Sequence, residues 1–164
     1  IEDVLNKSEP QKEVTLYCAI LKKENFELAV QKATEVGVKK IVPVLTSRTI
    51  KTNLRFDRLE KITKEAAEQS GRALVPAINQ ILNLESAFDL AKENDLNLFF
   101  DVSGEKFNSD SKGKIGIFIG PEGGWDTSEL VAARAAGFQV VTLGPRTLRA
   151  ETAAVVASYL AIAL

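Results

Sequence analysis

The 164-residue sequence contains no histidine, no methionine and a single cysteine, Cys18. The absence of histidine excludes catalytic centres of the Ser-His-Asp and Cys-His types. A single cysteine excludes a disulfide framework, which favours a cytoplasmic setting. Without histidine it also argues against a zinc site, and we expect no bound metal. Because Cys18 stands in an apolar, strand-like run, we expect a small buried side chain there.

Long apolar runs are also missing. No run reaches the 18 residues of a membrane span and no signal peptide is recognisable, so we expect no membrane association. Because the sequence begins at Ile1 and has no methionine, we expect that it lacks its natural N-terminus. Residues 1–13 are interpreted as a linker or the remnant of a missing N-terminal domain, and residues 14–164 as one compact domain.

Charge is balanced in total but not along the chain. The net charge of −1 argues against nonspecific nucleic-acid binding by the whole surface. The charged residues in 83–110 are mostly acidic, whereas those in 39–64 are mostly basic. The basic run is interpreted either as a phosphate-binding face or as an ordinary solvated surface. Its basic residues are Lys39, Lys40, Arg48, Lys51, Arg55, Arg58, Lys61 and Lys64.

Apolar, β-branched runs alternate with segments of helical periodicity. Such alternation is typical of an α/β fold with a mostly parallel sheet flanked by helices. Pro43 interrupts the second predicted strand and should place it near a sheet edge or at a bulge. The predicted strands cover residues 14–20, 41–45 and 96–102, and the predicted helices cover residues 25–36, 54–70 and 84–93.

Two further strand-like runs, residues 115–119 and 138–143, each end before a Gly-Pro pair. Each pair opens a polar loop that leads into a helical segment. Ligands of parallel sheets bind beyond the carboxyl ends of the strands, so the two loops predict a site for a small molecule. Neither loop has the lysine of a P-loop or the spacing Gly-x-Gly-x-x-Gly of dinucleotide-binding proteins.

The first loop reads Gly120-Pro121-Glu122-Gly123-Gly124-Trp125. Its glycines let the backbone approach a ligand closely, and Pro121 stiffens the loop. Asp126 is predicted to cap the following helix, with Glu129 completing a capping box. The alternative interpretation is a tight turn from strand to helix with no ligand.

The second loop, Gly144 to Arg149, precedes an alanine-rich segment of high helix propensity. In it, Arg146 and Arg149 flank Leu148. Arginine suits the binding of carboxylate or phosphate in a fork geometry, which favours a ligand-binding role. The alternative is that one of the two arginines is a structural partner of Glu122 or Glu151.

The run from Ile119 to Gly124, followed by the run from Leu143 to Ala153, resembles the RsmE family. These are SPOUT-class methyltransferases that methylate N3 of a uridine in small-subunit (16S) ribosomal RNA. Residues 31–38 and 65–72 also resemble segments of the family, in the same order along the chain. The resemblance therefore covers nearly the whole sequence.

The resemblance implies a SPOUT α/β-knot, in which the C-terminal helix threads the preceding loop as a trefoil knot. It also implies S-adenosyl-L-methionine as cofactor, ribosomal RNA or the small ribosomal subunit as partner, and a role in ribosome biogenesis in the cytoplasm. Members of the family carry an N-terminal PUA-like RNA-binding domain, which would precede this chain. They form homodimers through the last helix, whose apolar residues here include Val155, Val156, Leu160, Ile162 and Leu164.

The resemblance also predicts the roles of individual residues. Arg149 is predicted to be catalytic by stabilising the uridine anion, and Arg72 to hold substrate phosphate or the dimer partner. The group that deprotonates N3 stays open between a carboxylate, a neighbouring ligand group and an arginine that stabilises the anion. The predicted cofactor-binding residues are Ile119, Gly120, Glu122, Gly123, Gly124, Leu143, Gly144, Arg146, Leu148 and Thr152.

Two other functions fit the same loops. One is a non-catalytic knotted module that holds RNA or a nucleotide. The other is a phosphate-binding protein that uses helix N-termini, which the missing P-loop lysine disfavours. The unbroken pair of loops favours the enzyme over both.

Overall fold

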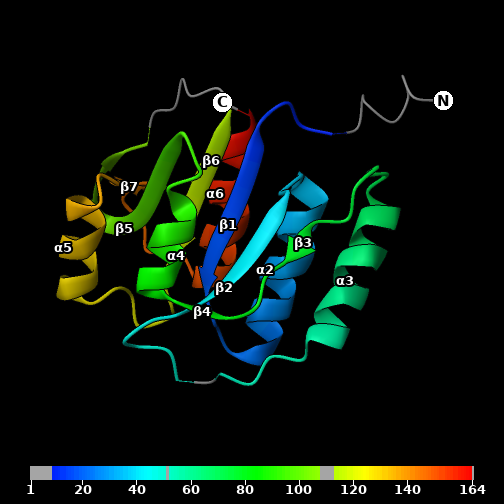
Figure 1. Ribbon diagram of the computed structural model, residues 1–164, viewed down its shortest axis with the longest axis horizontal. Helices are drawn as coiled ribbons and strands as arrows, with labels where there is room; N and C mark the ends of the chain where they lie inside the picture. The colour runs from blue at the N-terminus through cyan, green and yellow to red at the C-terminus, as the bar shows by residue number, and fades with distance from the viewer. Residues whose placement is uncertain (1–8, 51, 108–112, 164) are drawn as a thin grey trace.

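The computed structural model describes residues 9–50, 52–107 and 113–163 of the chain, and Figure 1 shows the arrangement of its helices and strands. The strands are β1 (Glu13–Ala19), β2 (Lys40–Leu45), β3 (Ala77–Ile78), β4 (Leu82–Asn83), β5 (Leu96–Lys106), β6 (Lys114–Ile119) and β7 (Gln139–Thr142). The helices are α2 (Lys23–Val36), α3 (Phe56–Gln69), α4 (Leu84–Ala91), α5 (Thr127–Ala135) and α6 (Ala150–Ala163). Within these described residues, no helix is both long enough and apolar enough to cross a membrane.

The seven strands form one sheet with the order β3-β2-β1-β6-β5-β7, and β4 also pairs with β2. Every described strand pair is parallel, so the carboxyl ends of the strands lie on one edge of the sheet. The loops that follow β2 and β6 meet at this edge, at the bottom of Figure 1. The predicted α/β fold with a mostly parallel sheet flanked by helices is therefore confirmed.

Pro43 lies in β2, the second strand from one edge of the sheet, which agrees with the prediction that the proline would place its strand near a sheet edge or at a bulge. It pairs with Cys18 of β1 on one side. On the other side, β3 and β4 pair with the two ends of β2 and leave Val42 and Pro43 without a partner. Because proline has no backbone N–H to donate, the break between β3 and β4 accommodates it.

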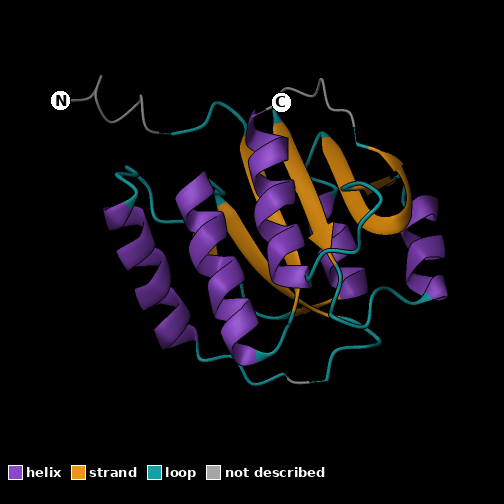
Figure 2. Ribbon diagram, turned by 180° about the vertical axis from the view of Figure 1, so that it is seen from behind, coloured by secondary structure: helices purple, strands orange, loops and turns teal. Residues whose placement is uncertain are grey.

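Apolar residues gather on both faces of the sheet. Helices α2, α3 and α6 cover one face, which is toward the viewer in Figure 2. Helices α4 and α5 belong to the other face, in front of the sheet in Figure 1. Because successive strand residues point to opposite faces, Ile117 and Phe118 of β6 belong to different cores. The first core includes Leu16, Phe26, Leu59, Ile117 and Ala154, and the second includes Tyr17, Ala87, Phe118, Ala133 and Phe138.

Cys18 belongs to the first core and is buried. Burial raises the pKa of its thiol to about 12, so the side chain is a neutral thiol at physiological pH. The prediction of a small buried side chain at this position is confirmed.

Strand β5 is longer than predicted and curls around its neighbour β7, as Figure 2 shows. Val141 of β7 pairs with Phe100 and again with Glu105, with a register shift between the two. Gly104 lies against Val141 so closely that a Cβ atom would stand 2.4 Å from the carbonyl carbon of Val141. The strand that was predicted to end at residue 102 therefore continues to Lys106, because the absence of a side chain at Gly104 permits this approach.

Helix α6 packs against α2, β1 and β6, so it lies beside elements from the first part of the described chain. Its small residues Ala154, Ala157, Ser158 and Ala161 are buried. The larger apolar residues on its other sides are only half-buried, and Tyr159 is 58% exposed. The helix therefore leaves part of its apolar surface uncovered. Leu164 lies outside the described residues, and the threading of α6 as a trefoil knot stays a prediction.

Candidate active site at the carboxyl edge of the sheet

A cavity of about 670 Å³ opens at the carboxyl edge of the sheet. Its walls come from the loop after β6, from the loop between β7 and α6, from the middle of β5 and from the start of α2. A volume of this size is within the range that holds a small organic ligand, which is about 300–1,000 Å³. The two loops that the sequence singled out thus face one cavity.

Trp125 fixes the first loop to the sheet. Its indole N–H donates a hydrogen bond to the carbonyl oxygen of Phe100, at 3.0 Å, and its ring centre lies 4.1 Å from that of Phe99. Gly120 lies directly against the indole, because a Cβ atom there would be 3.0 Å from the ring. Trp125 therefore holds the backbone of Gly120 at the cavity wall.

The predicted capping box at the start of α5 is confirmed. The Asp126 carboxylate accepts a hydrogen bond from the backbone N–H of Ser128, and the Glu129 carboxylate accepts one from that of Asp126, at 2.8 Å. Hydrogen bonds from Ser128 also hold the pKa of Asp126 below its usual value. The second oxygen of Glu129 accepts a hydrogen bond from the backbone N–H of Ser47, so the cap also binds the loop after β2.

Arg48 makes the second connection between these two loops. Its guanidinium donates to the carbonyl oxygen of Gly123 at 2.7 Å and lies 3.6 Å from the Asp126 carboxylate. Glu122 connects the first loop to the start of α2, because its carboxylate accepts a hydrogen bond from the backbone N–H of Lys22 at 2.9 Å. The first loop is thereby fixed from three sides before any ligand binds.

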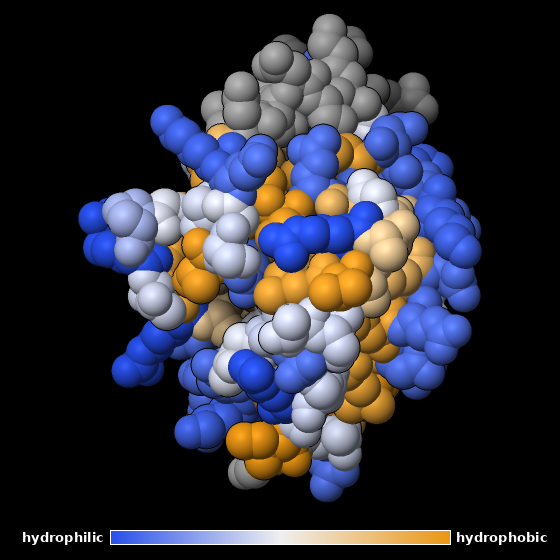
Figure 3. Space-filling view, turned by 90° about the vertical axis from the view of Figure 1, so that its left-hand side faces the viewer, coloured by the Kyte–Doolittle hydropathy of each residue, from blue (hydrophilic) through white to orange (hydrophobic). Residues whose placement is uncertain are grey.

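Most of the basic run of residues 39–64 is paired with acidic side chains. Besides Arg48, the ion pairs of this run are Lys39–Glu13, Arg55–Asp57, Arg58–Glu27 and Lys61–Glu65, and Lys51 lies outside the described residues. This pairing agrees better with a solvated surface than with a bare phosphate-binding face. On the side that carries α5 and β7, hydrophobic and hydrophilic residues are mixed (Figure 3).

The second loop begins with a left-handed backbone at Gly144, where φ is 118°. The Thr142 hydroxyl donates to the carbonyl oxygen of Gly144 at 3.1 Å and stabilises this turn. Arg146 and Arg149 follow as exposed residues that line the cavity. Among the described residues, neither arginine forms an ion pair with Glu122 or Glu151. Both guanidinium groups can therefore contact a ligand in the cavity.

Most of the predicted site residues lie together. Gly144 and Thr152 are not part of the cavity wall, although Gly144 shapes the loop that forms it. Phe100, Asp101, Val102, Lys22 and Asn25 line the cavity without having been predicted. The predicted residues in the wall are Ile119, Gly120, Glu122, Gly123, Gly124, Leu143, Arg146, Leu148 and Arg149.

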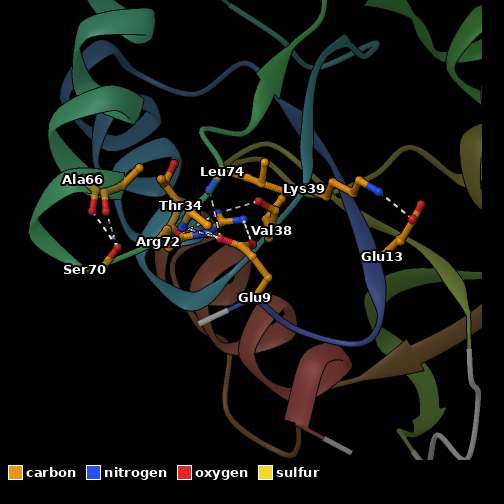
Figure 4. A network of polar contacts seen from close by, with 11 residues as sticks. Glu9, Glu13, Thr34, Val38, Lys39, Ala66, Ser70, Arg72 and Leu74 are labelled. Atoms are coloured by element: carbon orange, nitrogen blue, oxygen red, sulfur yellow. Dashed lines mark hydrogen bonds and ion pairs between the residues drawn. The ribbon is translucent and has the colours of Figure 1, made fainter. Parts of the chain in front are cut away.

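Arg72 is not brought to this cavity. Its side chain is only 4% exposed, and its guanidinium donates to the carbonyl oxygens of Thr34 and Val38 at 2.9 and 2.8 Å. It also forms an ion pair with Glu9 at 2.8 Å, as Figure 4 shows. Arg72 thus bridges the carboxyl end of α2 and the segment that leads into β1. The last carbonyl groups of a helix have no partner within the helix, and Arg72 supplies hydrogen-bond donors for them.

Glu9 is the counterpart of Arg72 in this network. Its carboxylate accepts further hydrogen bonds from the backbone N–H groups of Ala73 and Leu74. Burial by itself would raise the pKa of Glu9, but the hydrogen bonds and the positive charge of Arg72 together lower it. Of the predicted linker, residues 1–8 lie outside the described residues, whereas Glu9 is firmly attached to the domain.

Known proteins resemble this chain in sequence and in fold. A family model described as an RNA methyltransferase domain matches residues 7–162. The ribosomal RNA small subunit methyltransferase E of Mesomycoplasma hyopneumoniae is 40% identical over 163 residues, which cover 94% of this chain and 71% of that protein. The protein of the same description in Rickettsia conorii is 33% identical over 165 residues, covering 96% and 67%. The chain belongs to this family.

The solved structures agree with the family. Ribosomal RNA small subunit methyltransferase E from Neisseria gonorrhoeae, bound to S-adenosyl methionine, matches with a TM-score of 0.86 and 36% identity. The match covers 93% of this chain and 66% of that one, so the chain spans about two thirds of its relative's length. The resemblance to the methyltransferase family and the SPOUT fold class are confirmed, and residues 7–162 form an RNA methyltransferase domain.

The Glu9–Arg72 network predicts a pH-dependent stability for this methyltransferase domain. We expect Glu9→Gln to lower the free energy of unfolding at pH 7 by about 1.5–3 kcal/mol, because hydrogen bonds to charged groups contribute that much. The ionised carboxylate stabilises the fold above its ordinary pKa of 4.5, and this contribution is lost as the pH falls through the lower pKa of the folded state.

Urea unfolding at pH 7 and at about pH 3 measures this difference. The gap between wild type and variant should close at the acidic pH. Glu65→Gln, which removes an exposed ion pair with Lys61, is the control and should change stability by less than about 1 kcal/mol. A gap of equal size at both pH values would contradict the role of the Glu9 charge.

Proposed function

We propose that this chain is the catalytic domain of an S-adenosylmethionine-dependent methyltransferase that acts on N3 of a uridine in small-subunit ribosomal RNA. The observation that carries the proposal is that both Gly-Pro loops line one cavity in a chain of this family. The S-adenosyl methionine bound to the Neisseria gonorrhoeae relative supports the choice of cofactor. A ribosomal RNA substrate implies a role in ribosome biogenesis in the cytoplasm.

The cavity walls fit such a cofactor. Ile119, Leu143 and Leu148 offer an apolar slot for the adenine ring, and the glycine backbones of the first loop offer main-chain donors and acceptors beside it. The Glu122 carboxylate lines the same cavity and suits the cationic sulfur of the cofactor electrostatically. When bound, the cofactor supplies a methyl group on that sulfonium. The protein's task is then to align the acceptor nitrogen with it.

The two arginines of the second loop suit the RNA side of the reaction. Both are exposed at the cavity, and a guanidinium presents several donors in a rigid fork. Uridine N3 becomes nucleophilic only when it loses its proton, and the resulting negative charge spreads onto the two carbonyl oxygens of the base. Arg149, directly before α6, is the residue that we assign to stabilising this anion.

The turn at Gly144 gives a direct test of cofactor binding. Gly144→Val forces a branched side chain into a left-handed backbone, which costs roughly 1–3 kcal/mol of strain and displaces the loop. We expect calorimetry to show S-adenosylmethionine binding by the wild type, no binding of ATP, and no detectable cofactor binding by the variant. Tight binding of ATP instead would favour a phosphate-binding protein.

Gly137→Val is the matched control for Gly144→Val. Gly137 also has a positive φ, 80°, and a Cβ atom at either glycine would meet nothing within 4 Å. Gly137 does not line the cavity. Both variants should lose similar stability in thermal unfolding, but only Gly144→Val should lose the cofactor. Equal cofactor affinity in the two variants would refute the assignment of the second loop.

Arg149 is tested by a change that keeps its charge. Arg149→Lys loses the planar fork, so we expect the single-turnover rate of RNA methylation by the full-length protein to fall by about 10²–10³. Cofactor affinity should stay nearly unchanged. Arg134→Lys, exposed on α5 and outside the cavity, is the control and should leave the rate unchanged. If affinity falls as far as the rate, Arg149 binds the cofactor and does not stabilise the anion.

We also propose that the chain functions as a homodimer. The half-buried apolar residues of α6, together with the exposed Tyr159, form a surface that one subunit leaves partly uncovered. We expect light scattering at micromolar concentration to give the mass of a dimer. Tyr159→Glu introduces a charge on this surface and should shift the mass toward the monomer. A monomeric wild type would contradict the proposal.

A further inference from the structure

Three carboxylates line the cavity: those of Asp101, Glu122 and Glu151. Two of them already have partners. The Asp101 carboxylate accepts hydrogen bonds from the backbone N–H and the hydroxyl of Ser103, and that of Glu122 accepts from the backbone N–H of Lys22. Glu151 differs, because its Oε2 is enclosed and has no hydrogen-bond partner among the described residues.

Glu151 is also the most buried of the three, with 8% of its surface exposed. A buried polar group without a partner costs free energy, and such groups in folded proteins call for a specific explanation such as a catalytic role. Glu151 stands in the first turn of α6, where the helix dipole stabilises a negative charge. The helix terminus therefore favours negative charge at this position, while the buried Oε2 has no hydrogen-bond donor among the described residues.

The proposed reaction supplies a donor of this kind. Uridine N3 carries a hydrogen that must leave before or during methyl transfer, and the chain has no histidine to accept it. The other titratable groups in the wall are Lys22, Arg146 and Arg149, which are cationic near neutral pH and cannot act as bases. Among the wall residues, this leaves a carboxylate as the proton acceptor.

We propose that Glu151 is the catalytic base of this site, an assignment that rests on the proposed function. The N3–H bond breaks and its proton moves to a Glu151 oxygen. The electron pair of N3 then forms the bond to the methyl carbon, and the carbon–sulfur bond breaks to leave a neutral thioether. Glu151 returns the proton to water after product release. Arg149, two residues earlier, stabilises the negative charge that the proton leaves on the uracil ring.

Glu151→Gln tests the proposal, because it keeps the shape of the side chain and removes its basicity. In the full-length protein, we expect the single-turnover rate on an RNA fragment to fall by about 10²–10³, the typical contribution of a positioned base. Calorimetry should give a cofactor affinity within about twofold of wild type. Thermal unfolding should give an equal or higher Tm, because the variant no longer buries an unpartnered charge.

A second substrate separates proton removal from a structural effect. Fluorine at C5 makes the N3 hydrogen of uridine more acidic, so 5-fluorouridine at the target position depends less on a base. The ratio of wild-type to Glu151→Gln rates should therefore shrink at least about tenfold on this RNA. Glu151→Asp, which keeps a carboxylate, should recover part of the rate. Glu68→Gln on the exposed face of α3 is the control and should behave as wild type.

The outcomes distinguish this inference from the function on which it rests. If the wild type fails to methylate N3 of uridine, the proposed function is wrong. If the wild type methylates N3 and Glu151→Gln keeps its rate within about threefold, only the assignment of Glu151 is wrong. The assignment also fails if cofactor affinity falls as far as the rate, or if the rate ratio is the same for uridine and 5-fluorouridine.

Discussion

The parallel pairing of β6 between β1 and β5 is the constraint on which the site depends. Because the three strands run in the same direction, the loop after β6, the middle of β5 and the start of α2 meet at one edge of the sheet. β7 joins the same edge through its pairing with β5 and adds the second Gly-Pro loop. A reversal of any one of these strands would carry its loop to the far edge, and the cavity would lose a wall.

The first Gly-Pro loop is also held by contacts that need no ligand. Trp125 attaches the first loop to β5, Glu122 attaches it to the start of α2, and Arg48 and Glu129 attach it to the loop after β2. Each contact uses a backbone donor or acceptor, so it fixes the path of the chain and not only a side chain. Pre-formed loops reduce the conformational entropy that a ligand must overcome on binding. A methyl transfer that depends on alignment benefits from such a site.

Sequence reasoning located both loops, the capping box and the alternation of strands and helices, because each has a local pattern: glycine with proline, Asp126 with Glu129, and apolar periodicity. It missed Phe100 to Val102 and Lys22. These residues reach the site because β5 and β1 pair with β6, and no local sequence pattern marks such a pairing. Sequence reasoning also predicted that Arg72 holds substrate phosphate or the dimer partner; within the described chain, Arg72 instead binds the open carbonyls at the end of α2 and the carboxylate of Glu9. Tertiary partners decide the role of an arginine, and a single sequence does not display them.

The position of α6 has a consequence for synthesis of the chain. Helix α6 covers the middle of the sheet by packing on β1, β6 and α2, all of which precede it in the chain. Until α6 has been made, the apolar residues of β1 and β6 beneath it have no cover, and exposed surface of this kind makes nascent chains prone to aggregation. The core beneath α6 is thus complete only after β1, α2 and β6 have all been made.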